Sequence, residues 1–292
     1  MASSVARLGG NSQTSPMSMT ASGLLRASHP EPAAAVTVVA GLLAWGVGHR
    51  PSGIAAVACT VLASQLAVGW SNDHLDAERD AAVGRTDKPV AAGAVSARAV
   101  GLATRAASLA TVLLAAATTN RTAAFCAALA LVSALLYNWP LKSTPVSVLP
   151  YAVSFGALPA FVVLALPGAP RPPIWLVAAA ALLGAGAHFA NVLPDLADDA
   201  RTGVRGLPHR LGAAGSRVAA AALLLAATVT LVAGPPGPPS WAGLAAVAAA
   251  AGVPPLTWYA SRGARRGVAA FRAVMLVALI DVVLLVANGR VV

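Results

Sequence analysis

The sequence predicts an all-α, polytopic membrane protein with nine transmembrane helices around a central cavity. Of its 292 residues, 58% are hydrophobic and only 10% are charged, and the mean hydropathy is +0.73. Soluble domains typically contain about 25% charged and roughly 45–50% apolar residues, so a water-soluble fold of this size would expose too much apolar surface. Lipid is therefore the expected solvent.

The net charge of +10 does not indicate a nucleic-acid-binding protein. Such proteins carry a basic face on a soluble domain. Here the Lys and Arg residues lie in short segments between apolar runs, as membrane topology requires. We expect contact with membrane lipid and no nucleic acid partner.

Nine apolar segments are long enough to cross a bilayer, which takes roughly 17–25 helical residues. Pro residues within or beside the fifth and sixth segments predict kinks there. Residues 1–25 contain no long apolar run and are expected to form a disordered tail, which leaves 26–292 as the membrane domain. The nine segments are 33–49, 53–70, 99–118, 122–138, 146–166, 173–193, 216–233, 240–260 and 268–288.

The basic residues predict the orientation, because loops rich in Lys and Arg stay in the cytoplasm. With nine alternating spans and a cytoplasmic N-terminus, sixteen of the 20 Lys and Arg residues fall on the cytoplasmic side and four on the other. The excess of Arg over Lys and the abundant Ala fit a GC-rich genome. We therefore expect a multi-pass protein of a bacterial cell membrane.

Eight of the ten acidic residues fall in two of the predicted cytoplasmic loops. Acidic residues contribute little to orientation, so a chemical role explains them better. The two loops lie four spans apart, and each acid cluster precedes a stretch that contains Arg, Gly and Pro. This internal repeat predicts two four-helix units and a ninth helix, with the two loops facing each other across the cavity.

The first acidic motif runs from Asn72 to Asp80. If the second span continues through it as a helix, Asp73, Asp76 and Asp80 fall at positions i, i+3 and i+7 and share one face. Three carboxylates on one face repel each other unless a cation lies between them, and hard oxygen donors of this kind suit Mg²⁺. A solvated acidic loop is the alternative.

The second motif follows the sixth span, where Asp195 and Asp199 are four residues apart and again share a face. Asn191 precedes Asp195 by one turn, and His188 lies almost a turn earlier. For Asn191 and His188, the sequence allows both a role in helix packing and a contact with substrate.

Two acidic motifs over one cavity predict two or more Mg²⁺ ions that hold a diphosphate. The diphosphate also needs positive charge nearby, which Arg85, Lys88 and Arg201 can supply. The alternative is that these three residues only determine topology. At the end of the fourth span, Tyr137 is typical of an interfacial anchor and Lys142 of a topology charge.

Together these motifs resemble the UbiA family of intramembrane prenyltransferases. The similar patterns are Asn-Asp-x-x-Asp-x-x-x-Asp followed by Arg-x-x-Lys-Pro, Tyr-x-x-x-x-Lys after the fourth span, and Asp-x-x-x-Asp after the sixth. The resemblance implies that Tyr137 lines the pocket near the diphosphate, and Arg26 is similar to an Arg near the family's first span. The implied diphosphate ligands are Arg85, Lys88 and Lys142. The implied Mg²⁺ ligands are Asn72, Asp73, Asp76, Asp80, Asp195 and Asp199.

The resemblance implies Mg²⁺-dependent transfer of a prenyl group from a prenyl diphosphate to a small aromatic or lipophilic acceptor within the membrane. Asn191 and Arg201 are further candidates for substrate binding. A terpene cyclase, or another diphosphate-activated group transferase of the same fold, is the first alternative. The expected catalytic residues are Asp76, Asp195, Arg85 and Lys88.

A cation transporter is the non-enzymatic alternative. Acids that conduct ions lie near the bilayer midplane, and in this sequence only Asp281 is expected there. A charge at that depth costs about 2.5–3.5 kcal/mol on insertion scales. Asp281 is therefore expected either to be structural or to line the substrate cavity.

Overall fold

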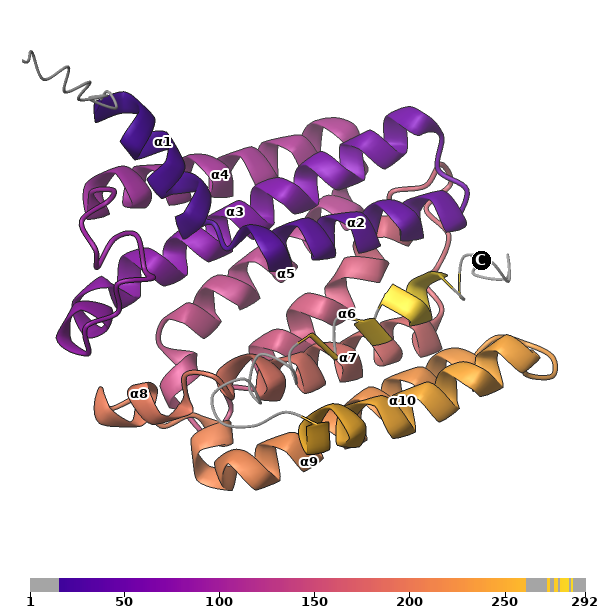
Figure 1. Cartoon of the computed structure of the whole chain (residues 1–292). Helices are drawn as coiled ribbons and strands as arrows, with labels where there is room; N and C mark the ends of the chain where they lie inside the picture. Colours follow the sequence, from indigo (N-terminus) through magenta and orange to yellow (C-terminus); the bar gives the residue numbers. More distant parts are fainter. Residues whose placement is uncertain (1–15, 261–271, 274–275, 278, 284, 286–292) are drawn as a thin grey trace, which may run out of the picture.

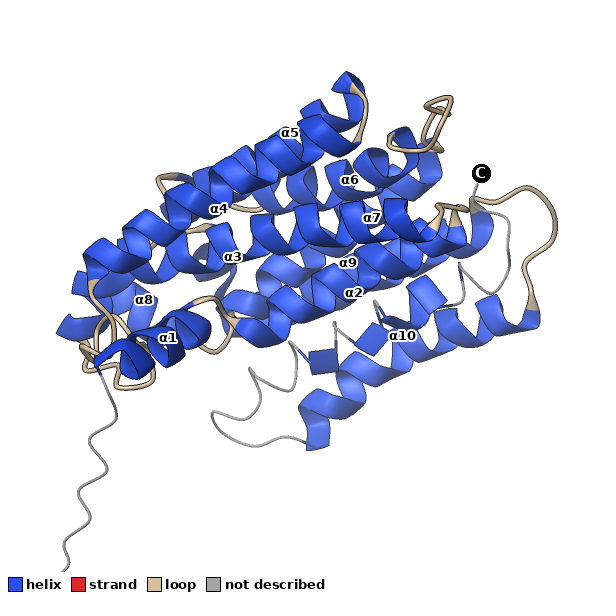
Figure 2. Cartoon of the chain, turned by 90° about the horizontal axis from the view of Figure 1, so that it is seen from above, coloured by secondary structure: helices blue, strands red, loops and turns tan. Residues whose placement is uncertain are grey.

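The computed structural model describes residues 16–260 and, beyond them, residues 272–273, 276–277, 279–283 and 285. All regular secondary structure in these residues is helical, which confirms the predicted fold class. Long helices lie side by side in both views (Figures 1 and 2). The elements are α1 (Pro16–Ala27), α2 (Pro30–Gly46), α3 (Pro51–Ala82), α4 (Ala97–Thr118), α5 (Arg121–Asn138), the short 3₁₀ helix η1 (Leu141–Ser143), α6 (Leu149–Leu164), α7 (Ile174–Val192), α8 (Leu196–Arg201), α9 (Leu207–Ala233) and α10 (Trp241–Ala260).

Eight of the nine predicted apolar segments coincide with a helix, namely α2 to α7, α9 and α10. Five of these helices, α3, α4, α5, α7 and α9, are long and apolar enough to cross a membrane, while α6 and the first part of α10 are apolar but shorter. The ninth predicted segment, 268–288, lies largely outside the residues that the structure describes.

Each long helix packs against the next one along the chain, and the same order of neighbours occurs twice. α2, α3, α4 and α5 contact one another in that order, and so do α6, α7, α9 and α10, with α5 and α6 joining the two groups. In Figure 1, α2, α3 and α4 lie at the top and α7, α9 and α10 at the bottom. The division into two four-helix units and a ninth helix stays a prediction.

The segment expected to be a disordered tail, residues 1–25, overlaps helix α1, which begins at Pro16. The end of this helix is held by tertiary contacts: Ala27 is fully buried in a cluster with Val95 and Val100. Trp70 Nε1 also donates a hydrogen bond of 2.8 Å to Leu24 O. Because these partners lie far along the chain, the local sequence does not reveal them.

Helix α3 extends well past the predicted span 53–70 and carries the whole first motif as far as Ala82. Gly69 allows the turn between α1 and α2 to lie directly on this helix, because a Cβ atom there would come within 2.4 Å of Ser28 O. The next residue in that turn is His29, whose backbone is left-handed with φ 52° and ψ 66°. The close approach brings His29 to Asp73, one turn beyond Gly69.

The second motif does not continue the sixth span as one helix. α7 ends at Val192, and Asp195 is the N-cap of the separate short helix α8. After α8 the chain packs against η1 at Gly206, where a Cβ atom would lie 2.3 Å from Lys142 O. α9 then begins at Leu207, before the predicted start at 216, and bends at Gly212 (φ 68°, ψ 177°).

Candidate active site

Both acidic motifs line one cavity of about 800 Å³, whose wall is formed by helices of both halves of the chain. Asn72, Asp76 and Asp80 of α3 line it from one side, and Asp195 and Asp199 line it from the α8 segment. The convergence of the two motifs that the sequence predicts is therefore present in the structure.

Arg85 links the loop that follows the first motif to the second motif. Its Nη1 atom donates a hydrogen bond of 2.8 Å to Asp195 Oδ1. Nε donates to Asp87 Oδ1 and Nη2 to Asp87 Oδ2, both at 2.8 Å. Hydrogen bonds from Arg85 to Asp87, together with the Asp195 carboxylate, raise the pKa of this guanidinium above its usual value. Arg85 therefore stays charged and holds the loop after α3 against the start of α8.

Lys142 brings a positive charge from η1 to the first motif. Its Nζ atom pairs with the carboxylate of Asp76, which also accepts from Arg79 and from Asn72 Nδ2, the latter at 3.1 Å. Burial lowers the pKa of Lys142, whereas the Asp76 charge opposes that shift. The side chain is only about a tenth exposed, so it is a partly desolvated cation that faces the cavity.

Asp73 differs from its neighbours in the first motif because it does not line the cavity. The side chain is 1% exposed, and Oδ1 lies 3.1 Å from Lys88 Nζ and 3.2 Å from His29 Nε2. Its Oδ2 atom is buried without a hydrogen-bond partner among the described residues. The structure thus places this predicted metal ligand behind Lys88 and His29, both of which line the cavity.

Burial, and after it the neighbouring Asp195 carboxylate, raise the pKa of Asp199 to about 6. His209 Nε2 lies 3.6 Å from Asp199 Oδ2, too far for a hydrogen bond. The adjacent Asp198 pairs instead with Arg201, whose side chain is largely exposed. Asp199 is therefore the cavity-facing acid of α8.

Two basic residues proposed from the sequence do not reach the cavity. Arg201 pairs with Asp198 and is largely exposed, and Arg26 is exposed at the end of α1. Neither residue lines the cavity, whereas His29, which the sequence did not indicate, does. His29 lies more than forty residues before the first motif, so no sequence spacing predicts that it is near the site. Its position follows from the close approach of Ser28 to Gly69 of α3.

We call the charged end of the cavity its mouth; it is lined by Asn72, Asp76, Asp80, Asp195 and Asp199 together with His29, Arg85, Lys88 and Lys142. Aromatic side chains lie next to it. The Tyr137 and Tyr151 rings contact each other edge to face with centroids 4.8 Å apart, and Asn191 Nδ2 donates to Tyr151 OH at 3.1 Å. His188 is 1% exposed and does not line the cavity; its Nε2 atom lies 3.0 Å from Ser147 Oγ. The structure therefore assigns His188 to helix packing and Asn191 to the cavity wall.

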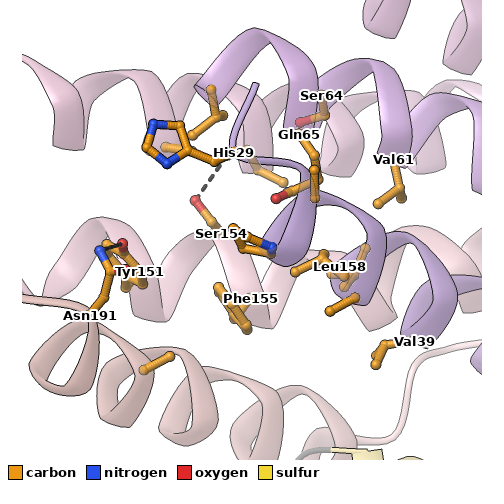
Figure 3. A pocket seen from close by; sticks show the side chains of 18 of the residues that line it. His29, Val39, Val61, Ser64, Gln65, Tyr151, Ser154, Phe155, Leu158 and Asn191 are labelled. Atoms are coloured by element: carbon orange, nitrogen blue, oxygen red, sulfur yellow. Dashed lines mark hydrogen bonds between the residues drawn. The ribbon is translucent and has the colours of Figure 1, made fainter. Parts of the chain in front are cut away.

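The interior of the cavity is mainly apolar. Figure 3 shows Val39, Val61, Phe155 and Leu158 along its wall, together with the polar Ser64, Gln65 and Ser154. Asp281 also lines the cavity, is 4% exposed, and accepts a hydrogen bond of 2.9 Å from Thr228 Oγ1. Both roles expected for Asp281 are thus compatible with its position.

The acidic residues suit a hard divalent cation such as Mg²⁺, because they offer carboxylate oxygens beside the amide oxygen of Asn72. Within the described residues, no three His, Cys, Asp or Glu side chains are already grouped to hold an ion. Basic side chains separate them, since Asp76 and Asp195 each pair with Lys or Arg. Mg²⁺ keeps several water ligands and uses one or two carboxylates plus phosphate oxygens, so the donors fit without a preformed cage.

Comparison with known proteins points in the same direction. A family model described as the UbiA prenyltransferase family matches residues 33–280. The digeranylgeranylglyceryl phosphate synthase of Methanopyrus kandleri is 34% identical over 173 residues, which cover 54% of this chain and 59% of that relative. The aligned part thus spans little more than half of the relative's length.

Two solved structures share the fold. A UbiA homologue from Archaeoglobus fulgidus bound to GPP and Mg²⁺ superposes with a TM-score of 0.69 at 16% identity, over 91% of this chain and 98% of that one. A UbiA homologue from Aeropyrum pernix K1 gives a TM-score of 0.67 at 21% identity, over 92% and 97% of the two chains. At such identities the likeness concerns the fold alone.

Proposed function

We propose that this chain, which belongs to the UbiA prenyltransferase family, transfers a prenyl group from a prenyl diphosphate to a small aromatic or lipophilic acceptor inside the membrane. The observation that carries the proposal is that both acidic motifs line one end of a single, largely apolar cavity, where the Arg85–Asp195 ion pair joins the loop after the first motif to the second motif. A prenyl diphosphate has the same division into a highly charged end and an apolar chain.

The acidic residues that line the cavity would hold Mg²⁺, which stabilises the negative charge that develops on the departing diphosphate. Asn72, Asp76 and Asp80 would bind from α3, and Asp195 and Asp199 from the α8 segment. We do not include Asp73 among these ligands, because it lies behind Lys88 and outside the cavity wall. Asp73 instead fixes the position of the Lys88 ammonium.

Three basic side chains would bind the diphosphate oxygens: Arg85, Lys88 and Lys142. Each one is paired with an aspartate in the structure. When a diphosphate enters, Arg85 and Lys142 exchange their aspartates for its oxygens, and Mg²⁺ would become the partner of Asp195 and Asp76. Lys88 would keep its contact with the buried Asp73. The charges of all three also stabilise the leaving group as the bond to carbon breaks.

The C–O bond of the allylic diphosphate breaks heterolytically, with the electron pair leaving on the diphosphate and an allylic cation left on the prenyl group. The acceptor attacks this cation and then loses a proton. The rings of Tyr137 and Tyr151 lie beside the acids, where an aromatic face stabilises a cation. The apolar side chains deeper in the cavity exclude the water that would otherwise quench it.

The nature of the acceptor is also part of the proposal. The name of the Methanopyrus relative denotes a phosphorylated glycerol lipid as its product, so such a lipid is a candidate beside a phenol or a naphthalenediol. We further propose that the mouth of the cavity faces the cytoplasm, as the distribution of Lys and Arg indicates, and that the membrane is bacterial.

The direct test measures pyrophosphate release by the purified protein in liposomes with Mg²⁺ and geranylgeranyl diphosphate. A phenol, a naphthalenediol and a geranylgeranylglyceryl phosphate are offered separately as acceptors. We expect release only with an acceptor, and loss of release in Asp76→Ala and Asp195→Ala. Glu78→Ala is the matched control, because Glu78 is an exposed acid on the same helix that does not line the cavity.

Two outcomes would favour the alternatives. Pyrophosphate release that needs no acceptor would indicate a cyclase, with a cyclic hydrocarbon or alcohol as the product. Cation flux into the same liposomes that persists in Asp76→Ala and Asp195→Ala would indicate a transporter. Absence of release with all three acceptors, from protein that retains its helical circular dichroism, would contradict the transferase proposal.

A further inference from the structure

Polar side chains of α3 extend the polar face of the first motif into the interior of the cavity. Thr60, Ser64 and Gln65 all line the cavity on the same helix as Asn72. Gln65 lies seven residues before Asn72, so the two share one helix face about 10 Å apart along the axis. We call Thr60, Ser64 and Gln65 the α3 polar track; Figure 3 shows Ser64 and Gln65 beside Val61.

The three side chains of the track make no hydrogen bond with the described residues. Thr60 Oγ1 is buried and has no partner there, and Ser64 and Gln65 likewise have none. This differs from other polar groups on the same wall: Ser154 Oγ donates to Ala130 O at 2.9 Å, and Thr111 Oγ1 donates to Ala107 O at 2.9 Å.

Thr60 Oγ1 is buried, whereas Ser64 and Gln65 are half-buried in the mainly apolar wall of the cavity. A substrate that covers these groups without a hydrogen bond would desolvate them at a cost. The isoprenoid chain cannot satisfy them, because a hydrocarbon has neither hydrogen-bond donors nor acceptors. Of the two substrates, only the acceptor can therefore pair with the track.

The charge of the surroundings limits the kind of group that fits. Among the described residues, the basic side chains that line the cavity are His29, Arg85, Lys88 and Lys142, all of them at the mouth. The interior contributes Asp281 instead, which disfavours an anion further. A carboxylate or phosphate at the depth of Gln65 would be desolvated without a cation.

We infer that the α3 polar track binds a neutral hydrogen-bonding group of the acceptor, such as a hydroxyl or carbonyl, while any anionic group of that acceptor stays at the mouth. The inference rests on the proposed transfer reaction and specifies the class of acceptor. Because the attacking atom must reach the carbon next to the diphosphate, the acceptor spans from that carbon toward Gln65. It thus carries its neutral polar group on the side away from the acids.

The first measurement separates a ligand-binding role from a structural one. Gln65→Leu replaces the amide by an apolar side chain of similar size. If the amide has no partner in the fold, the melting temperature of the variant in detergent stays the same or rises. A fall of several degrees shows that Gln65 is bonded within the protein and overturns the inference.

The second measurement uses the pyrophosphate-release assay with whichever of the phenol, the naphthalenediol and the geranylgeranylglyceryl phosphate the wild type accepts. For Gln65→Leu we expect KM for that acceptor to rise about three- to tenfold, the loss of one neutral hydrogen bond. KM for geranylgeranyl diphosphate should not change. Ser108→Ala is the control and should leave both constants unchanged, because Ser108 Oγ donates to Thr104 O and does not line the cavity.

The possible failures are distinguishable. If the wild type uses none of the acceptors, the proposed function fails and this inference fails with it. If the wild type is active and Gln65→Leu shows an unchanged KM for the acceptor, or an equal rise in both KM values, only the inference is wrong. An unchanged KM together with a raised melting temperature would mean that water, and not the acceptor, satisfies the track.

Discussion

The mouth of the cavity and its interior differ in how their polar groups are satisfied. At the mouth, Asp76 and Asp195 already have basic partners from other elements, Lys142 and Arg85. In the interior, Gln65 and Thr60 have none among the described residues. The difference indicates that the basic side chains at the mouth can exchange an aspartate for the diphosphate. Within the described part of the chain, Gln65 and Thr60 lack a neutral hydrogen-bonding partner in the interior, which the acceptor would supply.

The largest effect is expected at the link between the two motifs. Arg85→Met removes the side chain that joins Asp195 to the loop after α3, and we expect kcat/KM to fall by about 10²–10³-fold. Arg85→Lys keeps the charge but not the planar guanidinium, so its activity should lie between those of Arg85→Met and the wild type. The comparison is made by steady-state pyrophosphate release.

Arg98→Met serves as the control for this pair. Arg98 is an exposed residue of α4 that does not line the cavity. Equal losses of kcat/KM in Arg85→Met and Arg98→Met would show that the effect arises from the total charge and not from the Arg85–Asp195 ion pair. That result would contradict a specific role of Arg85 at the mouth.

A second prediction concerns pH. The pKa of Asp199 is raised to about 6, so its carboxylate is protonated below that pH and cannot bind a cation. The apparent affinity for Mg²⁺ in the presence of prenyl diphosphate should therefore weaken as the pH falls below about 6. Isothermal titration between pH 5 and 7.5 measures this. In Asp199→Asn the weakening should be smaller than in the wild type, because only the protonation of the diphosphate itself remains.

The raised pKa of Asp199 also affects the stability of the metal-free protein, which should fall as the pH rises. Because the pKa in the fold lies above the unfolded value of about 3.9, the unfolded chain loses its proton first as the pH rises. Ionisation of Asp199 therefore destabilises the fold between about pH 4 and 6.

For the Mg²⁺ titration, an affinity that is constant down to pH 5 would show that Asp199 is not a ligand.

The smallest effect is expected from the packing that brings His29 to the mouth. In Gly69→Ala, the new Cβ atom would lie 2.4 Å from the backbone oxygen of Ser28, and relief of that contact should cost about 1–3 kcal/mol of stability. Gly41→Ala is the matched control, because no heavy atom lies within 4 Å of its Cβ position. That change should be neutral or stabilising by up to about 1 kcal/mol. Thermal melting in detergent distinguishes the two, and equal melting temperatures would contradict the close approach.

Helical periodicity and charge predict much of this arrangement. Apolar runs locate eight helices, and the i, i+3, i+7 spacing places Asp76 and Asp80 on one face of α3. The same spacing cannot separate Asp73 from them. Its position depends on Lys88 and His29, which reach it from a loop and from a distant turn.

The remaining differences have tertiary causes as well. α1 depends on Trp70 and on the cluster with Val95, neither of which is local to it. From its position in the sequence, Lys142 is typical of a residue that determines topology. In the structure, η1 places it beside the carboxylate of Asp76. The α3 polar track consists of common helix residues, and only the absence of partners around them distinguishes it.

The central claim is that both acidic motifs hold one diphosphate, and the most direct test is binding without turnover. A thio-linked, non-reactive analogue of geranylgeranyl diphosphate is titrated with Mg²⁺ into the wild type, Asp76→Ala, Asp195→Ala and Glu78→Ala. We predict that Asp76→Ala and Asp195→Ala each lose Mg²⁺-dependent binding of the analogue, while Glu78→Ala binds like the wild type. Wild-type affinity in either Asp76→Ala or Asp195→Ala would contradict a site shared by the two motifs.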